Sequence, residues 1–144
     1  MQELVYPSFP FKIKQVNGKD QIFDPLRQKW IILTPEEWVR QNILQYLVQV
    51  CKYPSSMIAI EKTIKLGELN KRFDIVVYKN ESPWIIIECK EANVPISEKT
   101  ISQILQYQQA MVARYLVVSN GHQTYGAKIE SGKLYPVQNF PDYL

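Results

Sequence analysis

The pattern of apolar and polar positions predicts a chain made mostly of short strands, interrupted by two helices. Residues 11–23 predict a β-hairpin, because Asn17-Gly18 is a preferred pair for a type I′ turn. A polar connection is expected over residues 67–71. Further strands are predicted over residues 30–33, 57–66, 73–78, 84–90, 115–119, 124–129 and 134–137.

Helical periodicity appears twice. The first helix is expected over about residues 35–51, with Thr34 as N-cap and Glu37 completing a capping box. Its apolar stripe is wide, which predicts a well-buried helix. The second helix is expected over about residues 97–112.

This order of elements predicts an α/β or α+β domain with a mixed sheet and helices packed on it. The three central strands can pair as a meander, and the strand after the second helix can join in parallel through a crossover. The whole chain, 1–144, is expected to be a single domain. Within it we distinguish an N-terminal hairpin extension (1–33), a core (34–126) and a C-terminal strand and tail (127–144).

Composition narrows the functional classes. A net charge of +3 permits a polyanionic partner without demanding one. Cys51 and Cys89 lack metal-ligand spacing and are expected to be reduced core residues. With neither a signal peptide nor a membrane-length apolar stretch, we expect a cytoplasmic protein with no membrane partner. The absence of a phosphate-binding P-loop motif excludes ATP-driven translocation by this chain.

One buried strand ends in charged residues, Glu88-Cys89-Lys90. Side chains two apart on a strand share a face, so Glu88 and Lys90 are expected to point together and Cys89 away. Asp74 lies near the start of the preceding strand. In an antiparallel pair, Asp74 and Glu88 would then be neighbours at one edge of the sheet.

Two adjacent carboxylates repel each other, and a divalent cation resolves the conflict. Oxygen ligands favour Mg²⁺, with Mn²⁺ as a substitute. Lys90 could orient or help deprotonate a water and offset charge at a phosphorus. The alternative interpretation is a salt-bridge cluster in which Lys90 only neutralises Asp74 and Glu88.

Other polar residues could support this site. Arg72 shares a face with Asp74 and could hold it or a phosphate, or be an ordinary ion-pair partner. Glu61, and Glu36 or Glu37, could supply a third acid, although the capping role alone accounts for Glu37. His122 follows a turn and is expected to be solvated.

Asp74 followed by the strand into Glu88-Cys89-Lys90 resembles the PD-(D/E)xK nuclease signature. Phe73 stands where that signature has proline. More narrowly, the chain resembles the N-terminal nuclease domain of type I restriction enzyme R subunits. The segments that carry this resemblance are LTPEEWVRQ (33–41), KRFDIVVY (71–78), IECKEANVPIS (87–97), QILQY (103–107) and VVSNG (117–121).

The resemblance implies a restriction-endonuclease-like core with elements in the order α-β-β-β-α-β. It implies that Asp74 and Glu88 bind the metal and that Lys90 is catalytic. Gln103 and Tyr107, one helical turn apart, would stabilise the site or contact DNA; the alternative is the polar flank of an amphipathic helix.

The sequence as a whole therefore predicts a metal-dependent DNA endonuclease, or nuclease-like domain, of restriction type. The alternative is a non-catalytic DNA-binding or accessory module with a nuclease fold. The expected partners are DNA and separate motor or specificity subunits. Because one site cuts one strand, a homodimer is a further expectation.

Overall fold

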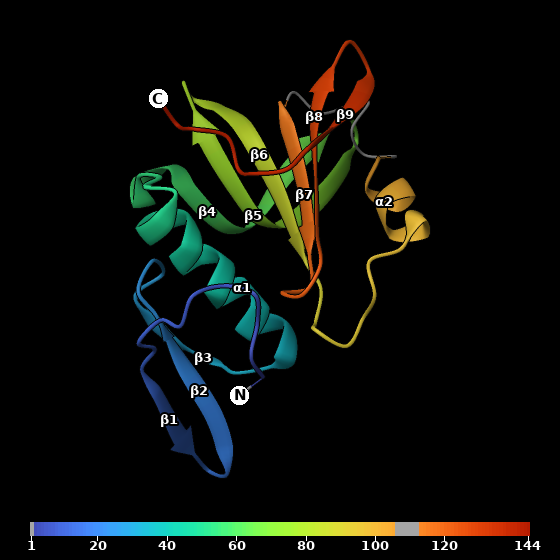
Figure 1. Cartoon of the computed structure of the whole chain (residues 1–144). Helices are drawn as coiled ribbons and strands as arrows, with labels where there is room; N and C mark the ends of the chain where they lie inside the picture. Colours follow the sequence, from blue (N-terminus) through green and yellow to red (C-terminus); the bar gives the residue numbers. More distant parts are fainter. Residues whose placement is uncertain (1, 106–112) are drawn as a thin grey trace.

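Helix α1 (Pro35–Gln45) lies between two separate sheets in the computed structural model (Figure 1), which describes residues 2–105 and 113–144. The N-terminal sheet is antiparallel, and its strands are β1 (Ile13–Val16), β2 (Lys19–Asp24) and β3 (Lys29–Ile32). Asn17 and Gly18 both have positive φ, 52° and 77°, which confirms the predicted turn.

The larger sheet has six strands in the order β4-β5-β6-β7-β8-β9. Its strands are β4 (Ile58–Leu66), β5 (Leu69–Lys79), β6 (Ser82–Cys89), β7 (Tyr115–Ser119), β8 (Thr124–Glu130) and β9 (Lys133–Val137). Among the described strands, only β6 and β7 pair in parallel, so the predicted meander and parallel crossover are both confirmed. The predicted polar connection over 67–71 is wrong, because β4 and β5 continue to a tight turn in which Gly67 has φ 63°.

The first helix spans the predicted length in two geometries. After α1 the turns widen into a π-helical segment, η1 (Tyr46–Val50), and a short 3₁₀ segment, η2 (Ser55–Met57), leads into β4. The Thr34 hydroxyl accepts a 3.0 Å hydrogen bond from the Glu37 N–H, as expected of an N-cap. The Glu37 carboxylate does not complete the capping box; it binds two arginines instead, since charge-assisted bonds are stronger.

The second helix is α2 (Glu98–Leu105), and the Ser97 hydroxyl accepts from the Thr100 N–H at its start. The predicted continuation to residue 112, including Tyr107, lies outside the described residues.

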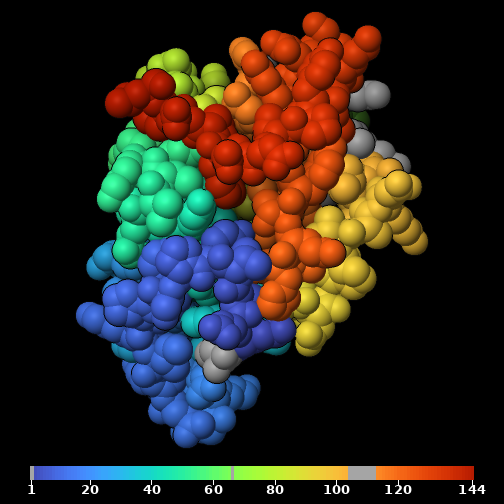
Figure 2. All heavy atoms as spheres, viewed as in Figure 1, coloured from blue at the N-terminus to red at the C-terminus, as the bar shows by residue number. Residues whose placement is uncertain are grey.

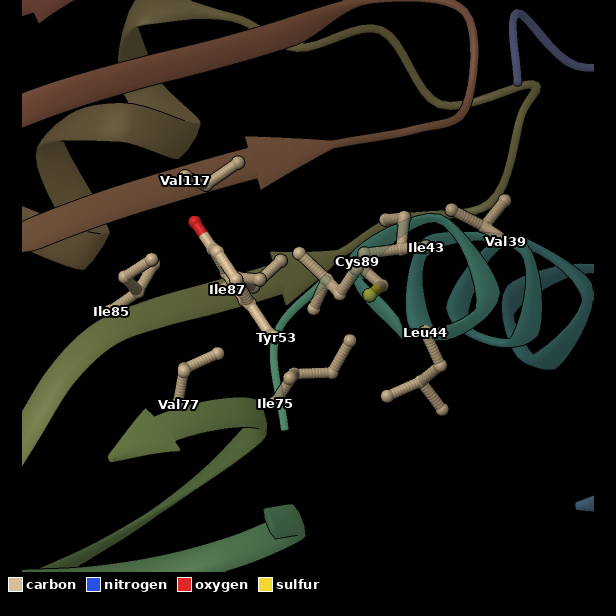
Figure 3. Close-up of a cluster of buried hydrophobic side chains, with 11 residues drawn as sticks. Val39, Ile43, Leu44, Tyr53, Ile75, Val77, Ile85, Ile87, Cys89 and Val117 are labelled. Carbon is tan, nitrogen blue, oxygen red and sulfur yellow. The ribbon is translucent and has the colours of Figure 1, made fainter. Parts of the chain in front are cut away.

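Apolar side chains cover both faces of the six-stranded sheet. Figure 3 shows the cluster between α1 and the sheet, in which Cys89 of β6 packs near Leu44 of α1 and Ile75 of β5. A second cluster on the other face includes Phe73, Val76 and Ile86. Both cysteines are free, as predicted.

The N-terminal segment crosses to the C-terminal half of the chain (Figure 2). The Val5 N–H donates to the Gly121 carbonyl at 2.9 Å, which fixes this segment beside the β7–β8 turn. The architecture is thus α+β, mostly strand, with a mixed sheet. Within the described residues, no helix has the length and apolar character needed to cross a membrane.

Candidate functional site

Asp74 and Glu88 lie where β5 and β6 separate. The regular pairing of these strands ends at Ile75 and Ile87, and the two acids are the next residues. The Cys89 N–H donates to Asp74 Oδ2 at 2.8 Å, so a side chain from β5 bridges the two strands here. The structure therefore brings together the two acids that the sequence placed at one sheet edge.

Asp74 and the next residue, Ile75, both lie on the α1 side of the sheet. Ile75 packs in the cluster beneath α1, whereas Phe73 packs in the cluster on the opposite face. Asp74 binds Arg40 of α1, with 2.9 Å between Oδ1 and Nη2. The alternation is interrupted here, opposite Glu61 of β4, whose φ is 52°. Irregularities in a sheet re-aim side chains in this way.

Glu88 is a buried carboxyl that lacks a full set of partners. Its residue is 8% exposed, and Oε1 has no hydrogen-bond partner. Two other buried side-chain atoms among the described residues share this property, Arg40 Nε and Gln41 Oε1. Burial first, and then Asp74, raise the pKa of Glu88 to about 8, against the lowering effect of Lys71 and Lys90. Glu88 thus retains a proton near neutral pH, which lets it donate to Asp74.

Asp74 has the opposite tendency. Burial alone would raise its pKa, but hydrogen bonds from Glu88, the Cys89 N–H and Arg40 outweigh burial and lower it. The two carboxyls therefore differ: Asp74 carries the negative charge, and Glu88 carries the proton.

Lys90 follows β6, and its N–H donates to the Ser119 carbonyl at 2.8 Å. Its ammonium opposes, without outweighing, the burial that raises the pKa of Glu88 and of Glu36 at the start of α1. Among the described residues no ion pair is formed by Lys90, and the cation on Asp74 is Arg40. The salt-bridge interpretation of Lys90 therefore lacks its expected contact.

A network of charged residues surrounds Arg40 on the side facing the N-terminal sheet. We call it the arginine–acid network and define it as Asp24, Arg27, Glu37, Arg40, Gln41 and Glu61. Glu37 links the two arginines, with 3.2 Å between its Oε2 and Arg27 Nη2. Burial would lower the pKa of Arg40, but Glu37 and Asp74 raise it well above its usual value. Arg40 therefore remains charged.

Asp24 anchors this network beneath the N-terminal sheet. It is fully buried, and its Oδ1 accepts from the backbone N–H groups of Leu26 and Arg27 at 2.8 and 2.9 Å. Its Oδ2 accepts from Arg27 Nε at 2.6 Å and Gln41 Nε2 at 2.9 Å. Burial would raise its pKa, but these hydrogen bonds lower it.

Of the remaining predicted site residues, some lie in the arginine–acid network and others are exposed. Glu37 belongs to the arginine–acid network, and Glu61 lies at its edge with a side chain 38% exposed. Arg72 is exposed, and the guanidinium that holds Asp74 is that of Arg40, not Arg72 as suggested. Gln103 is exposed on α2.

Glu36 has an exposed side chain, yet it interacts electrostatically with Asp74 and Lys90. Of the two helix acids considered, Glu36 is therefore the one whose raised pKa reflects the nearby Asp74, after burial. His122 is exposed and bonds to Gln2 Nε2 at 3.0 Å.

Sequence reasoning missed Arg40, Arg27 and Asp24. Arg40 follows Glu36 and Glu37 at helical spacing, a pattern that usually marks surface ion pairs. Asp24 precedes a proline and suggested only a turn. A local signal existed for Arg40 and for Asp24, but the burial of the two residues together depends on how the N-terminal sheet packs on α1.

The site lacks a complete set of metal ligands as it stands. Within residues 2–105 and 113–144, no group of three or more His, Cys, Asp or Glu side chains is arranged to hold a metal ion. A cavity of about 330 Å³ lies elsewhere, lined by residues that include Tyr6, Tyr46 and Phe140. What the site does offer is one buried carboxyl oxygen without a hydrogen-bond partner, on Glu88, beside Asp74.

Comparison with known proteins gives the family. No curated protein matches the chain. The family model described as type I restriction enzyme R protein N terminus (HSDR_N) matches residues 35–141, from the first residue of α1 to beyond β9. This range includes Asp74, Glu88 and Lys90 and excludes the N-terminal sheet. The chain therefore belongs to the family of type I restriction enzyme R protein N-terminal domains.

Proposed function

We propose that this domain is a metal-dependent phosphodiesterase of restriction type that cuts DNA. The observation that carries the proposal is the buried Glu88 carboxyl, which has one oxygen without a partner and lies beside Asp74. Leaving such an atom buried and without a partner costs roughly 1–3 kcal/mol. Strongly perturbed carboxyl pKa values of this kind gather at functional sites.

Asp74 and Glu88 are the residues that would hold Mg²⁺, with Mn²⁺ as a substitute. Glu88 Oε1 has no hydrogen-bond partner, Arg40 and the Cys89 N–H bond to different oxygens of Asp74, and loss of the Glu88 proton would free the Asp74 lone pair that accepts it. When bound, the metal would polarise the phosphate and acidify a water. Glu88 must release its proton for this purpose, and the raised pKa makes that release dependent on pH.

The other residues act on charge and position. Arg40 and the Cys89 N–H fix the two oxygens of Asp74, so its carboxylate plane is set before any ligand arrives. Lys90 is the cation that can orient the attacking water and offset negative charge on the phosphate in the transition state. Glu36, near Lys90 and Asp74, is placed to accept a proton. We further propose that the core is restriction-endonuclease-like, and that motor or specificity subunits, or a second copy, act with it.

The test is a nicking assay on supercoiled plasmid with Mg²⁺ or Mn²⁺, comparing wild type, Lys90→Ala and the exposed-lysine control Lys133→Ala. Loss of Lys90 should lower the rate by about a hundredfold or more, the usual effect of removing a positioned charge donor. Metal binding by calorimetry should survive, because both carboxylates remain. Equal nicking by all three proteins would indicate a contaminant and overturn the assignment of Lys90.

A second candidate is a non-catalytic DNA-binding or accessory module. The observation that favours it is that Arg40 already neutralises Asp74, so the site has a resident cation. This candidate predicts no cleavage of any substrate and no calorimetric Mn²⁺ binding that depends on Glu88. Binding that is lost in Glu88→Gln would instead support the nuclease.

A further inference from the structure

One face of the N-terminal sheet is open to solvent and combines lysines with aromatic rings. In the register of this sheet Lys14 pairs with Gln21, and Phe23 pairs with Trp30, so their side chains share a face. Lys12 continues this row, since its carbonyl accepts from the Phe23 N–H. We call this surface the lysine–aromatic face; its members are Lys12, Lys14, Val16, Lys19, Gln21, Phe23, Trp30 and Ile32.

The opposite face of the same sheet packs against the rest of the protein. Ile22 and Asp24 are fully buried there, and Asp24 bonds to Gln41 of α1. The burial of one face explains the fold of the sheet but leaves the composition of the lysine–aromatic face unexplained.

The side chains of this face are already in contact with one another. The rings of Phe23 and Trp30 meet edge to face, with centroids 5.4 Å apart. Lys14 Nζ lies 4.2 Å from the centre of the Trp30 ring, and Lys12 Nζ lies 5.7 Å from that of Phe23. Trp30 is 38% exposed. None of the described strand residues on this face is acidic.

We propose that the lysine–aromatic face binds single-stranded DNA. Bases stack on exposed aromatic rings with little regard to sequence, while nearby lysines neutralise the phosphates. The ammonium groups of Lys12 and Lys14, which cover the rings, can turn outward to phosphates and uncover Phe23 and Trp30 for bases. With strands about 4.8 Å apart, three strands offer space for roughly two or three nucleotides.

Charge decides between this occupant and a second copy of the chain. An exposed sheet face with an aromatic centre could also pair with itself, but a symmetric pair would bring the lysines of one copy against those of the other. Like charges across an interface disfavour such a pair, whereas a polyanion is complementary to Lys12, Lys14 and Lys19.

The face lies outside the matched range 35–141, so family membership assigns it no role. Only the choice of DNA as the nucleic acid rests on the proposed function. Binding can be measured without metal, which separates this proposal from catalysis.

The test is fluorescence anisotropy of a labelled oligothymidylate with the full chain in EDTA, over a range of salt concentrations. The matched pair is Lys14→Gln on this face and Lys29→Gln, an exposed lysine next to Trp30 whose side chain belongs to the other face. Lys14→Gln should weaken binding several-fold and lower the salt slope by about 0.7. Trp30→Leu should weaken it roughly fivefold or more through lost stacking. Lys29→Gln should match wild type, and thermal melts should show all variants folded.

Three results would overturn the proposal. The first is an equal loss of oligonucleotide affinity in Lys14→Gln and Lys29→Gln, which would mean that the DNA is attracted only by the net positive charge of the protein. Another is equal affinity for duplex and single strand, which would mean that no base stacks. A sedimentation experiment that shows a dimer dissociated by Trp30→Leu would identify a second copy as the occupant. Failure of plasmid nicking with intact oligonucleotide binding would overturn the proposed nuclease activity and support DNA binding by the lysine–aromatic face.

Discussion

Asp24 and Glu88 are both buried carboxyls, yet the fold treats them in opposite ways. Asp24 accepts hydrogen bonds on both oxygens, from two backbone N–H groups and two side chains, and its pKa is lowered. Glu88 has one buried oxygen without a hydrogen-bond partner, and its pKa is raised to about 8. Burial is common to both residues, so the difference comes from the number and charge of their partners.

The comparison separates structural acids from candidate functional ones. In the arginine–acid network, Arg27 and Arg40 balance Asp24 and Glu37, and the network connects the N-terminal sheet to α1. At the end of β6, Glu88 forms no ion pair with an arginine of the described chain and faces a second acid. A carboxyl that the fold leaves uncompensated is ready for a ligand, whereas a fully bonded one is not.

The largest effect is expected from Asp24→Ala. This change removes one buried acceptor from both Arg27 and Gln41 and breaks a buried ion pair, which typically costs about 3–5 kcal/mol. Chemical denaturation should show this loss, while Asp20→Ala, an exposed acid of the same strand, should stay within about 0.5 kcal/mol of wild type. Equal stability of the two variants would remove the structural role assigned to Asp24.

Glu88→Gln should raise the free energy of unfolding, in contrast to Asp24→Ala. The pKa of Glu88 is raised from 4.5 to about 8, so its favourable contribution is complete below about pH 4.5 and is lost as pH rises toward 8. Without metal, the advantage of Glu88→Gln over wild type should therefore grow across this window, to on the order of 2 kcal/mol. Denaturation midpoints at pH 5 and pH 8 measure it, and a constant difference would contradict the raised pKa.

Metal affinity should depend on pH through the proton of Glu88. Because Glu88 must lose its proton to coordinate, Mn²⁺ affinity should rise by up to about tenfold per pH unit below pH 8. Calorimetry in buffers of different ionisation enthalpy should detect close to one proton released per ion. Affinity that is independent of pH between 6 and 8 would mean that the ion binds elsewhere.

The smallest effect is expected from Arg72→Ala. This arginine is exposed, and Arg40 already holds Asp74, so unfolding free energy should change by less than about 0.5 kcal/mol. A large loss of plasmid nicking with unchanged stability would instead place Arg72 on the phosphate. Denaturation and nicking assays on the same preparation distinguish the two results.

Local signals predicted much of this protein. The Asn17-Gly18 turn, the Thr34 cap, the meander and the parallel crossover all follow from interactions between residues close in sequence or from strand period. The approach of Asp74 to Glu88 also followed, because a short connection between antiparallel strands leaves little freedom in their register. The capping box failed, because the Glu37 carboxylate bonds to arginines that are distant in sequence or buried by packing.

The sequence by itself determined the N-terminal hairpin, the central meander with its parallel neighbour, and which two acids meet, since these depend on hydrophobic period and connection length. Only the tertiary structure decided the charge state of each acid. Packing of the N-terminal sheet on α1 gave Asp24 its partners, and packing of α1 on the larger sheet brought Arg40 to Asp74. Glu88 received no such partner, and a pKa depends on distances across the fold that no local pattern encodes.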